Sequence, residues 1–408
     1  MKKLKIIFRI FINLVLVEAG YSQGKPINLS CEHLINPLGI DAVMPRLSWQ
    51  VNDTRQGAKQ TAYEIFIGTD SSKLISTGKI KSDSQLIVYR RRQLKPFTRY
   101  YWKIKTWDNS NKEHVSQNAF FETGMLSIQN WKGSWISDSR DIALKPAAYF
   151  RKSFRATKNI KSARAYIACA GLYELSINGR AIGDHRLDPM YTRFDRRTLY
   201  VTYDVTNELR NDENCIGVLL GNGWYNHQST AVWYFHQAPW RSRPSFCMDL
   251  RITYDDESVE TISTGKDWKT NLSPVIFNSI YTAEHYDARL EIPHWNEPEY
   301  NDSAWKEVIF RPMPSANIVS QAMVPIRDVE HIPAKSMRKF SDSCYVFDLG
   351  RNIAGVSEIK LTGEAGTVVK LKHGERLYPN GHVDQSNIDV HYRPTDNTDP
   401  FQTDIYIL

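Results

Sequence analysis

Short runs of alternating apolar and polar residues, separated by Gly, Asn, Asp and Pro, constrain the fold of this chain most. Within residues 171–225, the run 173–177 ends in Asn178-Gly179. An Asn-Gly pair suits a type I′ hairpin turn because both central residues need φ > 0. Residues 214–220 are nearly all apolar, as expected of a strand buried on both faces. The sequence shows no run of paired amphipathic helices, so we predict an all-β protein.

Residues 25–125 contain five strand-like runs and predict one small sandwich. The runs are 27–32, 46–51, 62–68, 99–107 and 119–123. Short strands at this spacing, with Gly, Asp and Pro between them, favour an immunoglobulin or fibronectin-type sandwich. We interpret Trp49, Trp102 and Trp107 as core residues of this sandwich.

Several motifs, taken together and in order, resemble a known family. They are residues 36–41 with 45–49, Asn178-Gly179-Arg180 with Gly183-Asp184, residues 203–206 and Gly221-Asn222-Gly223-Trp224-Tyr225. This series resembles the N-terminal part of bacterial α-L-rhamnosidases (glycoside hydrolase family 78). Residues 266–269, 280–289 and 302–305 are also similar to the family, so the resemblance covers nearly all of residues 25–408.

The resemblance implies tandem β-sandwiches in a fixed order. After the immunoglobulin-like domain at 25–125, it implies a jelly-roll, galactose-binding-like domain over 130–320. Residues 325–408 resemble an incomplete concanavalin-like sandwich, because the sequence stops within a strand pattern. We expect this last segment to be frayed or prone to aggregation, since an unfinished sheet leaves an edge strand unpaired.

The same resemblance implies an inverting hydrolase of terminal α-L-rhamnose that uses two carboxylates. In the family these glutamates lie in an (α/α)₆ barrel, C-terminal to everything present here. We therefore assign no catalytic residue and expect this chain alone to be inactive. Glu375 and Asp384 are interpreted as solvated loop carboxylates.

The resemblance also predicts a sugar or calcium site on the jelly-roll loops. Related rhamnosidase jelly-roll domains can bind L-rhamnose through calcium, which takes several oxygen ligands. The candidates are Asp188, Asp195, Asn222, Trp224 and Asn226. They lie on three loops without a single-loop calcium signature. The alternative is that the two aspartates are turn residues and that Trp224 packs at the domain junction.

The N-terminus predicts export. Basic residues at Lys2, Lys3 and Lys5 precede an apolar run at 6–17, and small residues follow at 19–22. This pattern is typical of a signal peptide, here 1–22, and predicts a secreted or periplasmic protein. The apolar run is too short to span a membrane. The five widely spaced cysteines argue against a disulfide framework, and no Cys or His pair suggests zinc.

The net charge of +7 comes from 52 basic and 45 acidic residues spread over 408 positions. No concentrated basic face results, which argues against a nucleic-acid partner. We favour the N-terminal part of a secreted α-L-rhamnosidase acting on rhamnose-containing carbohydrate, with the barrel beyond this chain or on a separate chain. The alternatives are a stand-alone L-rhamnose-binding sandwich protein and an adhesion protein.

Overall fold

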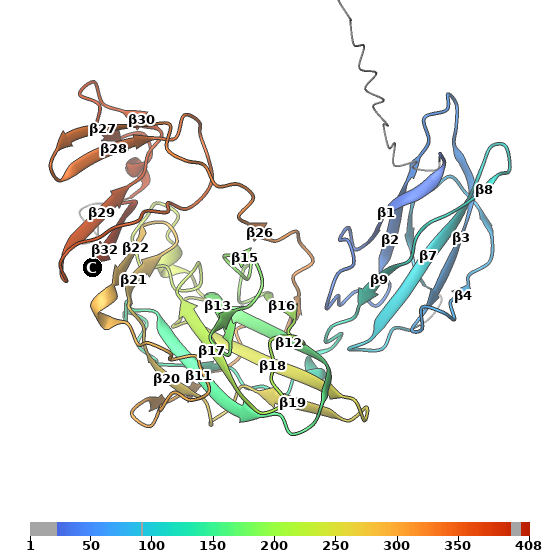
Figure 1. Cartoon of the computed structure of the whole chain (residues 1–408), viewed down its shortest axis with the longest axis horizontal. Helices are drawn as coiled ribbons and strands as arrows, with labels where there is room; N and C mark the ends of the chain where they lie inside the picture. The colour runs from blue at the N-terminus through green and yellow to red at the C-terminus, as the bar shows by residue number, and fades with distance from the viewer. Residues whose placement is uncertain (1–22, 91–92, 393–400) are drawn as a thin grey trace, which may run out of the picture. The chain divides into compact units, whose positions relative to one another are not determined.

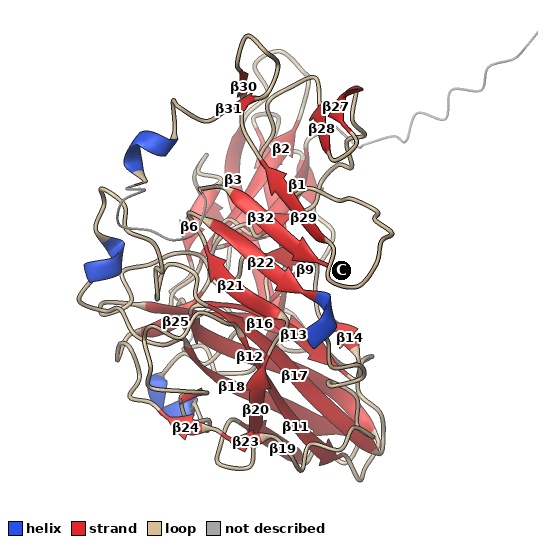
Figure 2. Ribbon diagram, turned by 90° about the vertical axis from the view of Figure 1, so that its left-hand side faces the viewer, coloured by secondary structure: helices blue, strands red, loops and turns tan. Residues whose placement is uncertain are grey.

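The computed structural model describes residues 23–90, 93–392 and 401–408. Its described regular structure is β, apart from short 3₁₀ turns of three residues each (Figure 2). This confirms the all-β prediction. The predicted signal peptide lies outside the described residues. None of the described helices is long or apolar enough to cross a membrane.

The described residues form two compact units. The first comprises the described part of Met1–Ile35, Pro45–Arg91 and Tyr100–Phe120, and the second comprises Asn36–Met44, the described part of Arg92–Arg99, and that of Phe121–Leu408. The short segment Asn36–Met44, which carries the first family-like motif, therefore folds with the second unit. Each unit is described by itself below.

The first unit contains an immunoglobulin-like sandwich (Figure 1). One sheet has the order β1-β2-β6, and its strands are β1 (Lys25–Cys31), β2 (Arg46–Asn52) and β6 (Leu86–Val88). The other has the order β4-β3-β7-β8, with β5 beside β3 and β9 beside β7. Its strands are β3 (Gln60–Gly68), β4 (Ile75–Ser76), β5 (Ile80–Lys81), β7 (Arg99–Asp108), β8 (Glu113–Val115) and β9 (Ala119–Glu122). Trp49, Trp102 and Trp107 are buried, as predicted.

The second unit is built on a seven-stranded and a six-stranded sheet. The seven-stranded sheet has the order β24-β10-β18-β12-β16-β25, with β19 beside β18. Its strands are β10 (Ile136–Ser137), β12 (Ile160–Ala170), β16 (Thr198–Asp204), β18 (Ser245–Tyr254), β19 (Val259–Ser263), β24 (Ile309–Phe310) and β25 (Ile318–Ser320). The six-stranded sheet has the order β14-β13-β17-β11-β20-β23. Its strands are β11 (Ala148–Arg155), β13 (Leu172–Ile177), β14 (Arg180–Ala181), β17 (Glu213–Gly221), β20 (Lys269–Leu272) and β23 (Lys306–Glu307).

One apolar core holds these two sheets together. Phe150 of β11 meets Phe246 of β18 edge to face, with ring centroids 5.1 Å apart. Strand β12 is buried on both faces: Ile167 and Cys169 join this core, whereas Tyr166 joins a second cluster on the opposite face. Side chains alternate across a strand, so a strand covered on both faces must be apolar at nearly every position. The run 214–220 in β17 is buried almost throughout, as predicted.

The hairpin turn at Asn178-Gly179 also forms as predicted. Both residues have positive φ, 51° and 80°, and the flanking strands β13 and β14 pair antiparallel. The Asn178 side chain adds a second function, because its Oδ1 accepts the backbone N–H of Cys215 at 2.9 Å. The turn is therefore anchored to β17 as well as to its own hairpin.

The family-like segment Asn36–Met44 is anchored to the jelly-roll through Asp41. The Tyr200 hydroxyl donates to Asp41 Oδ1 at 2.7 Å and accepts the backbone N–H of Met125 at 3.0 Å. The Ser320 N–H donates to Asp41 Oδ2 at 2.9 Å. Tyr200 is fully buried, so these bonds satisfy polar groups that water does not reach.

The last part of the chain joins the jelly-roll through a mixed sheet of order β21-β22-β32-β29 (Figure 1). Its strands are β21 (Val275–Ser279), β22 (Ala283–Asp287), β29 (Val368–Lys372) and β32 (Thr403–Ile407). Strand β32 pairs parallel with β22 and antiparallel with β29. The short pairs nearby are β15 (His185–Arg186) with β26 (Ile326–Arg327), β27 (Ser336–Ser341) with β28 (Cys344–Asp348), and β30 (Arg376–Leu377) with β31 (Val383–Asp384).

The concanavalin-like segment leaves many apolar side chains in solvent. Met337 on β27 and Phe347 on β28, which are register partners, are 58% and 51% exposed. Val356, in a stretch without regular structure, is 77% exposed. An isolated two-stranded hairpin is only marginally stable in water. The last strand, β32, is not the open edge that was predicted, because β22 and β29 pair with it on either side. Fraying or aggregation of the segment stays a prediction.

Candidate functional site

The residues predicted to bind a ligand do not all lie together in the second unit. Asn222, Trp224 and Asn226 follow β17 in a loop that we call the aromatic loop, residues 222–241. Asp188 lies in a different hydrogen-bond network, and Asp195 forms an ion pair with Arg193. The structure therefore brings three of the five candidates together.

Asn222 and Asn226 shape the start of the aromatic loop. Both side chains are almost fully buried. Asn226 Nδ2 donates to Asn222 Oδ1 at 3.0 Å, and the Arg241 guanidinium donates to Asn226 Oδ1 at 2.9 Å. Asn222 Nδ2 donates to the Asn278 carbonyl at 3.0 Å. The two amides thus tie both ends of the loop to each other and to β21.

Trp224 lies inside an aromatic cluster. Its ring stacks on His227 with an interplanar angle of 7° and a centroid separation of 5.8 Å. Phe235 and Tyr191 meet the same indole at 5.2 and 5.9 Å. Trp224 is half-buried, so its first role is to pack the loop around His227.

His227 occupies the centre of this cluster and is fully buried. Its Nε2 lies 3.1 Å from the Ser229 hydroxyl, whereas Nδ1 has no hydrogen-bond partner within the described residues. Burial lowers the pKa of His227 from 6.5 to about 4, with smaller contributions from His236 and Arg241. The imidazole is therefore neutral at pH 7, because desolvation disfavours its charged form.

Asp188 is the centre of a buried network rather than a simple turn residue. Its Oδ2 accepts hydrogen bonds from the Tyr203 hydroxyl at 2.9 Å and lies 2.7 Å from His185 Nδ1. Its Oδ1 accepts from Gln321 Nε2 at 2.9 Å, and the Tyr203 and Tyr173 hydroxyls are 3.0 Å apart. Asp188 thus joins the hairpin region to the segment after β25.

Calcium needs several oxygen atoms whose lone pairs converge on one point. Both carboxylate oxygens of Asp188 already accept protein hydrogen bonds, and both of Asp195 accept from Arg193. The amide oxygens of Asn222 and Asn226 are likewise in use. The described residues contain no cluster of three His, Cys, Asp or Glu side chains that could hold a metal. The five candidates do not fit a calcium cage, and calcium-dependent binding stays a prediction.

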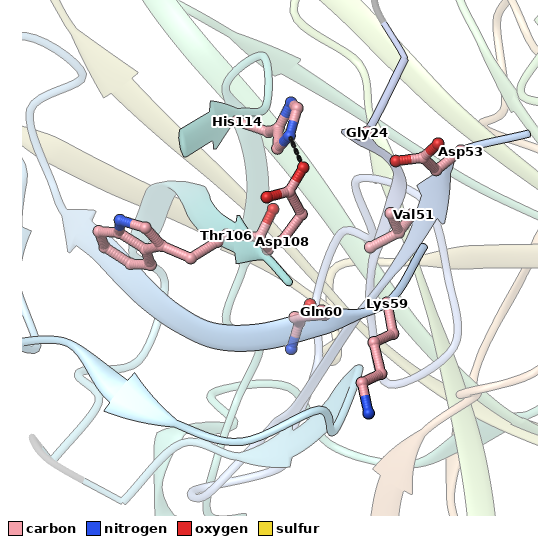
Figure 3. A pocket seen from close by; sticks show the side chains of 9 residues that line it. Gly24, Val51, Asp53, Lys59, Gln60, Thr106, Asp108 and His114 are labelled. Carbon is pink, nitrogen blue, oxygen red and sulfur yellow. Dashed lines mark hydrogen bonds and ion pairs between the residues drawn. The ribbon is translucent and has the colours of Figure 1, made fainter. Parts of the chain in front are cut away.

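A small crevice in the first unit brings Asp108 beside His114, 3.4 Å from carboxylate oxygen to Nε2 (Figure 3). Asp108 also accepts a hydrogen bond from Arg55 at 2.6 Å. That bond is the main cause that holds the pKa of Asp108 well below its usual range. A carboxylate already neutralised by a guanidinium is a poor proton acceptor or donor near pH 7. This crevice therefore has the character of a structural ion-pair site.

Three protein-family models match the chain one after another. The Rha78A-like N-terminal immunoglobulin domain matches residues 26–127, the α-L-rhamnosidase N-terminal domain 158–330, and the bacterial α-L-rhamnosidase concanavalin-like domain 338–408. The chain belongs to the bacterial α-L-rhamnosidase family. The predicted resemblance is confirmed.

Relatives of known name agree with this assignment. An α-L-rhamnosidase of Formosa agariphila is 30% identical over 85% of this chain and 40% of its own length. One of Alteromonas sp. is 29% identical over 93% of this chain and 43% of its own length. The solved α-L-rhamnosidase of Dictyoglumus thermophilum is 34% identical, with a TM-score of 0.82 over 94% of this chain and 44% of its own. The chain spans about two fifths of the length of these rhamnosidases.

The two carboxylates weighed in the rhamnosidase concanavalin-like segment differ in environment. The interpretation of Asp384 as a solvated loop carboxylate is wrong, because Asp384 ends strand β31, is buried and lies 3.1 Å from the Arg376 guanidinium. Hydrogen bonds from Ser386, with help from Arg376, hold the pKa of Asp384 below its usual value. An acid that stays ionised cannot protonate a leaving oxygen. Glu375 is exposed, as predicted for a loop carboxylate.

Sequence reasoning missed three aromatic residues of this rhamnosidase chain. Trp233 and Tyr234, in the aromatic loop, are 47% and 48% exposed. His227, which is buried and contacts the Tyr281 ring that Trp233 also meets, was not singled out either. The available signal was the run Trp233-Tyr234-Phe235, three successive aromatic residues outside any strand-like pattern.

Proposed function

We propose that this chain serves an α-L-rhamnosidase as its non-catalytic N-terminal portion. The observation that supports this most directly is the succession of three rhamnosidase domains in one order over residues 26–408. The substrate would be a carbohydrate or glycoside that ends in α-L-rhamnose. Two carboxylates outside the described residues would carry out hydrolysis with inversion.

The role proposed for the jelly-roll is that of a non-catalytic support whose own loops are held in fixed positions. Buried ion pairs and tyrosine hydroxyls fix the loops of the second unit, as at Tyr200 with Asp41. An inverting glycosidase needs two carboxyl groups about 6.5–9.5 Å apart, one able to donate a proton. Asp384 does not fit the role of the acid, because Ser386 and Arg376 favour its ionised form. We therefore place the acid–base pair on polypeptide beyond residue 408 or on a separate chain.

The test is an activity assay on the purified 408-residue chain with p-nitrophenyl α-L-rhamnopyranoside. We expect no turnover, because positioned acid–base groups typically contribute about 10²–10⁴-fold each and none is assigned here. Turnover that follows the monomer through two purifications and falls in Asp384→Asn would overturn the proposal. The matched control is Asp256→Asn, which alters an exposed carboxylate on a hairpin turn.

Export is the second part of the proposal. The basic and apolar N-terminal pattern supports a mature protein that begins near residues 20–24 and is secreted or periplasmic. Mass spectrometry of the native protein reports the terminus directly. Recovery of an intact Met1 or Lys2 terminus would remove the argument for export while leaving the rhamnosidase assignment unchanged.

A further inference from the structure

The chain contains three Asn-Gly pairs, Asn178-Gly179, Asn222-Gly223 and Asn380-Gly381. In such a pair the backbone nitrogen of glycine can attack the side-chain amide carbon of asparagine, because glycine has no side chain that hinders a close approach. The three pairs therefore have similar intrinsic reactivity. The fold decides which of them reacts.

The fold locks the first two pairs in place. Asn178 is 9% exposed, its Nδ2 donates to the Glu208 carbonyl, and its Oδ1 accepts the Cys215 N–H, both at 2.9 Å. Asn222 is 1% exposed, and its Nδ2 donates to the Asn278 carbonyl at 3.0 Å. Both pairs lie beside β17, an interior strand of the six-stranded sheet. Freeing either side chain requires part of that sheet to open, which has a high free-energy cost.

Asn380 lies in a different setting, the turn between β30 and β31, which we call the Asn380 turn, residues 378–382. Asn380 is exposed, and within the described residues its side chain makes one hydrogen bond, from the His382 N–H to Oδ1 at 3.1 Å. The Gly381 N–H donates to the Tyr378 carbonyl at 2.7 Å. Strands β30 and β31 have two residues each, and so short a hairpin is marginally stable in water. The turn therefore opens more readily than the sheet around β17.

Opening of the Asn380 turn makes the chemistry possible. Once the Gly381 N–H leaves the Tyr378 carbonyl, the Gly381 nitrogen bonds to Asn380 Cγ, the bond from Cγ to Nδ2 breaks, and ammonia leaves with the Gly381 proton. The product is a cyclic succinimide. Water then adds to either ring carbonyl and opens the ring to aspartate or isoaspartate, so the net change is loss of ammonia and gain of water. In isoaspartate the main chain runs through the side-chain methylene and is one carbon longer.

The Asn380 turn packs against β27, so a longer backbone has a structural consequence. The His382 ring stacks on Phe340 with centroids 4.1 Å apart, and the Arg338 guanidinium lies 4.6 Å from the same Phe340 ring. Gly381 has a φ of 90°, and a Cβ at this position would collide with the Arg338 guanidinium. The contact leaves no room for an added atom, so isoaspartate must displace the turn from Phe340.

We propose that Asn380 is a site of spontaneous deamidation and isoaspartate formation, and that this modification releases the Asn380 turn from β27. Met337, on the opposite face of β27, is already 58% exposed. Release of the turn therefore leaves this strand open to water on both faces. The proposal does not rest on the proposed function, because it needs neither a sugar nor a catalytic residue.

The experiment incubates the folded full chain at 37 °C and mildly alkaline pH. Peptide mapping with mass spectrometry follows the asparagine, aspartate and isoaspartate forms of all three pairs. We expect Asn380 to react about tenfold or more faster than Asn178 and Asn222, which corresponds to a difference of about 1.4 kcal/mol or more in the free energy of opening. The matched control is the same chain unfolded in guanidinium chloride, in which the three pairs should react at similar rates.

Limited digestion with trypsin tests the structural consequence. Cleavage after Arg338 should be faster in incubated than in fresh wild type, and unchanged by incubation in Asn380→Ser, which lacks the reactive amide and keeps an acceptor for the His382 N–H. Equal rates for the three pairs in the folded chain overturn the site. An excess at Asn380 that persists in guanidinium chloride also overturns it, because the fold would then not be the cause. Deamidation of Asn380 without faster cleavage after Arg338 overturns the release of the turn.

Discussion

Acid should destabilise the second unit through His227, and the structure gives the size of the effect. The buried imidazole has its pKa lowered from 6.5 to about 4. Below pH 6.5, His227 binds a proton in the unfolded chain but not in the folded chain. The free energy of unfolding therefore falls as the pH drops from 6.5 towards 4. One pKa unit corresponds to about 1.4 kcal/mol, so the full contribution is about 3 kcal/mol.

The variant that isolates this contribution is His227→Phe, which cannot titrate and keeps a ring against Trp224. As the pH falls from 7 to 4.5, we expect the free energy of unfolding of His227→Phe to rise by about 2 kcal/mol relative to that of wild type. Other groups whose pKa values are shifted, such as the buried Asp41, contribute equally to both proteins and cancel. At pH 7 the variant removes the unpartnered Nδ1 but also the hydrogen bond between Nε2 and Ser229, so the test uses the change of the stability difference with pH and not its value at pH 7.

Urea unfolding at half-unit pH steps, followed by tryptophan fluorescence, measures the difference for the transition of the second unit. Selective ¹³C labelling of histidine gives the His227 pKa directly by NMR. A stability difference between wild type and His227→Phe that stays constant from pH 7 to pH 4.5 refutes the reasoning. A measured pKa near 6.5 would show that the ring is hydrated.

Three further outcomes are expected. Tyr200→Phe should lower the free energy of unfolding by about 1–3 kcal/mol in chemical denaturation, because it leaves the buried Asp41 carboxylate short of a donor. Arg243→Met should lower the free energy of unfolding by about 3–5 kcal/mol in the same assay, because it leaves the Asp138 carboxylate, only 7% exposed, without its ion-pair partner. A smaller loss than for Tyr200→Phe would contradict this ranking. Millimolar CaCl₂ against EDTA tests the calcium prediction in melting curves, and a rise in melting temperature that Asp188→Asn leaves intact would place calcium on other oxygens.

Local patterns of the sequence were enough for the strands and turns. Alternation over 99–107 predicts β7, and Asn178-Gly179 predicts a turn whose two positive φ angles are present. These features depend on neighbours in sequence, so a single chain reveals them. The order of the sandwiches came from the family resemblance and not from residue patterns.

The site could not be predicted in the same way, because distant contacts create it. Asp188 precedes a proline and has the local pattern of a turn residue, yet Tyr203 and Gln321 make it a buried acceptor. Trp233 is exposed and fixed because Tyr281 and His391 meet it. A periodic pattern of apolar residues within one segment does not reveal contacts between segments that are distant in sequence. Asn222 and Asn226 were correctly placed at the loop, but their side-chain oxygens accept hydrogen bonds from Asn226 and Arg241 within the protein.

The parallel pairing of β32 with β22 constrains the order in which this protein can fold. The Glu284 N–H donates to Asp404 Oδ1 across 120 residues of sequence. Pairings of such long sequence separation form slowly, because the loop between the two strands must be closed first. The jelly-roll therefore keeps one strand edge open until the last part of the chain pairs with it. A chaperone that binds exposed strand edges would act during this stage of folding.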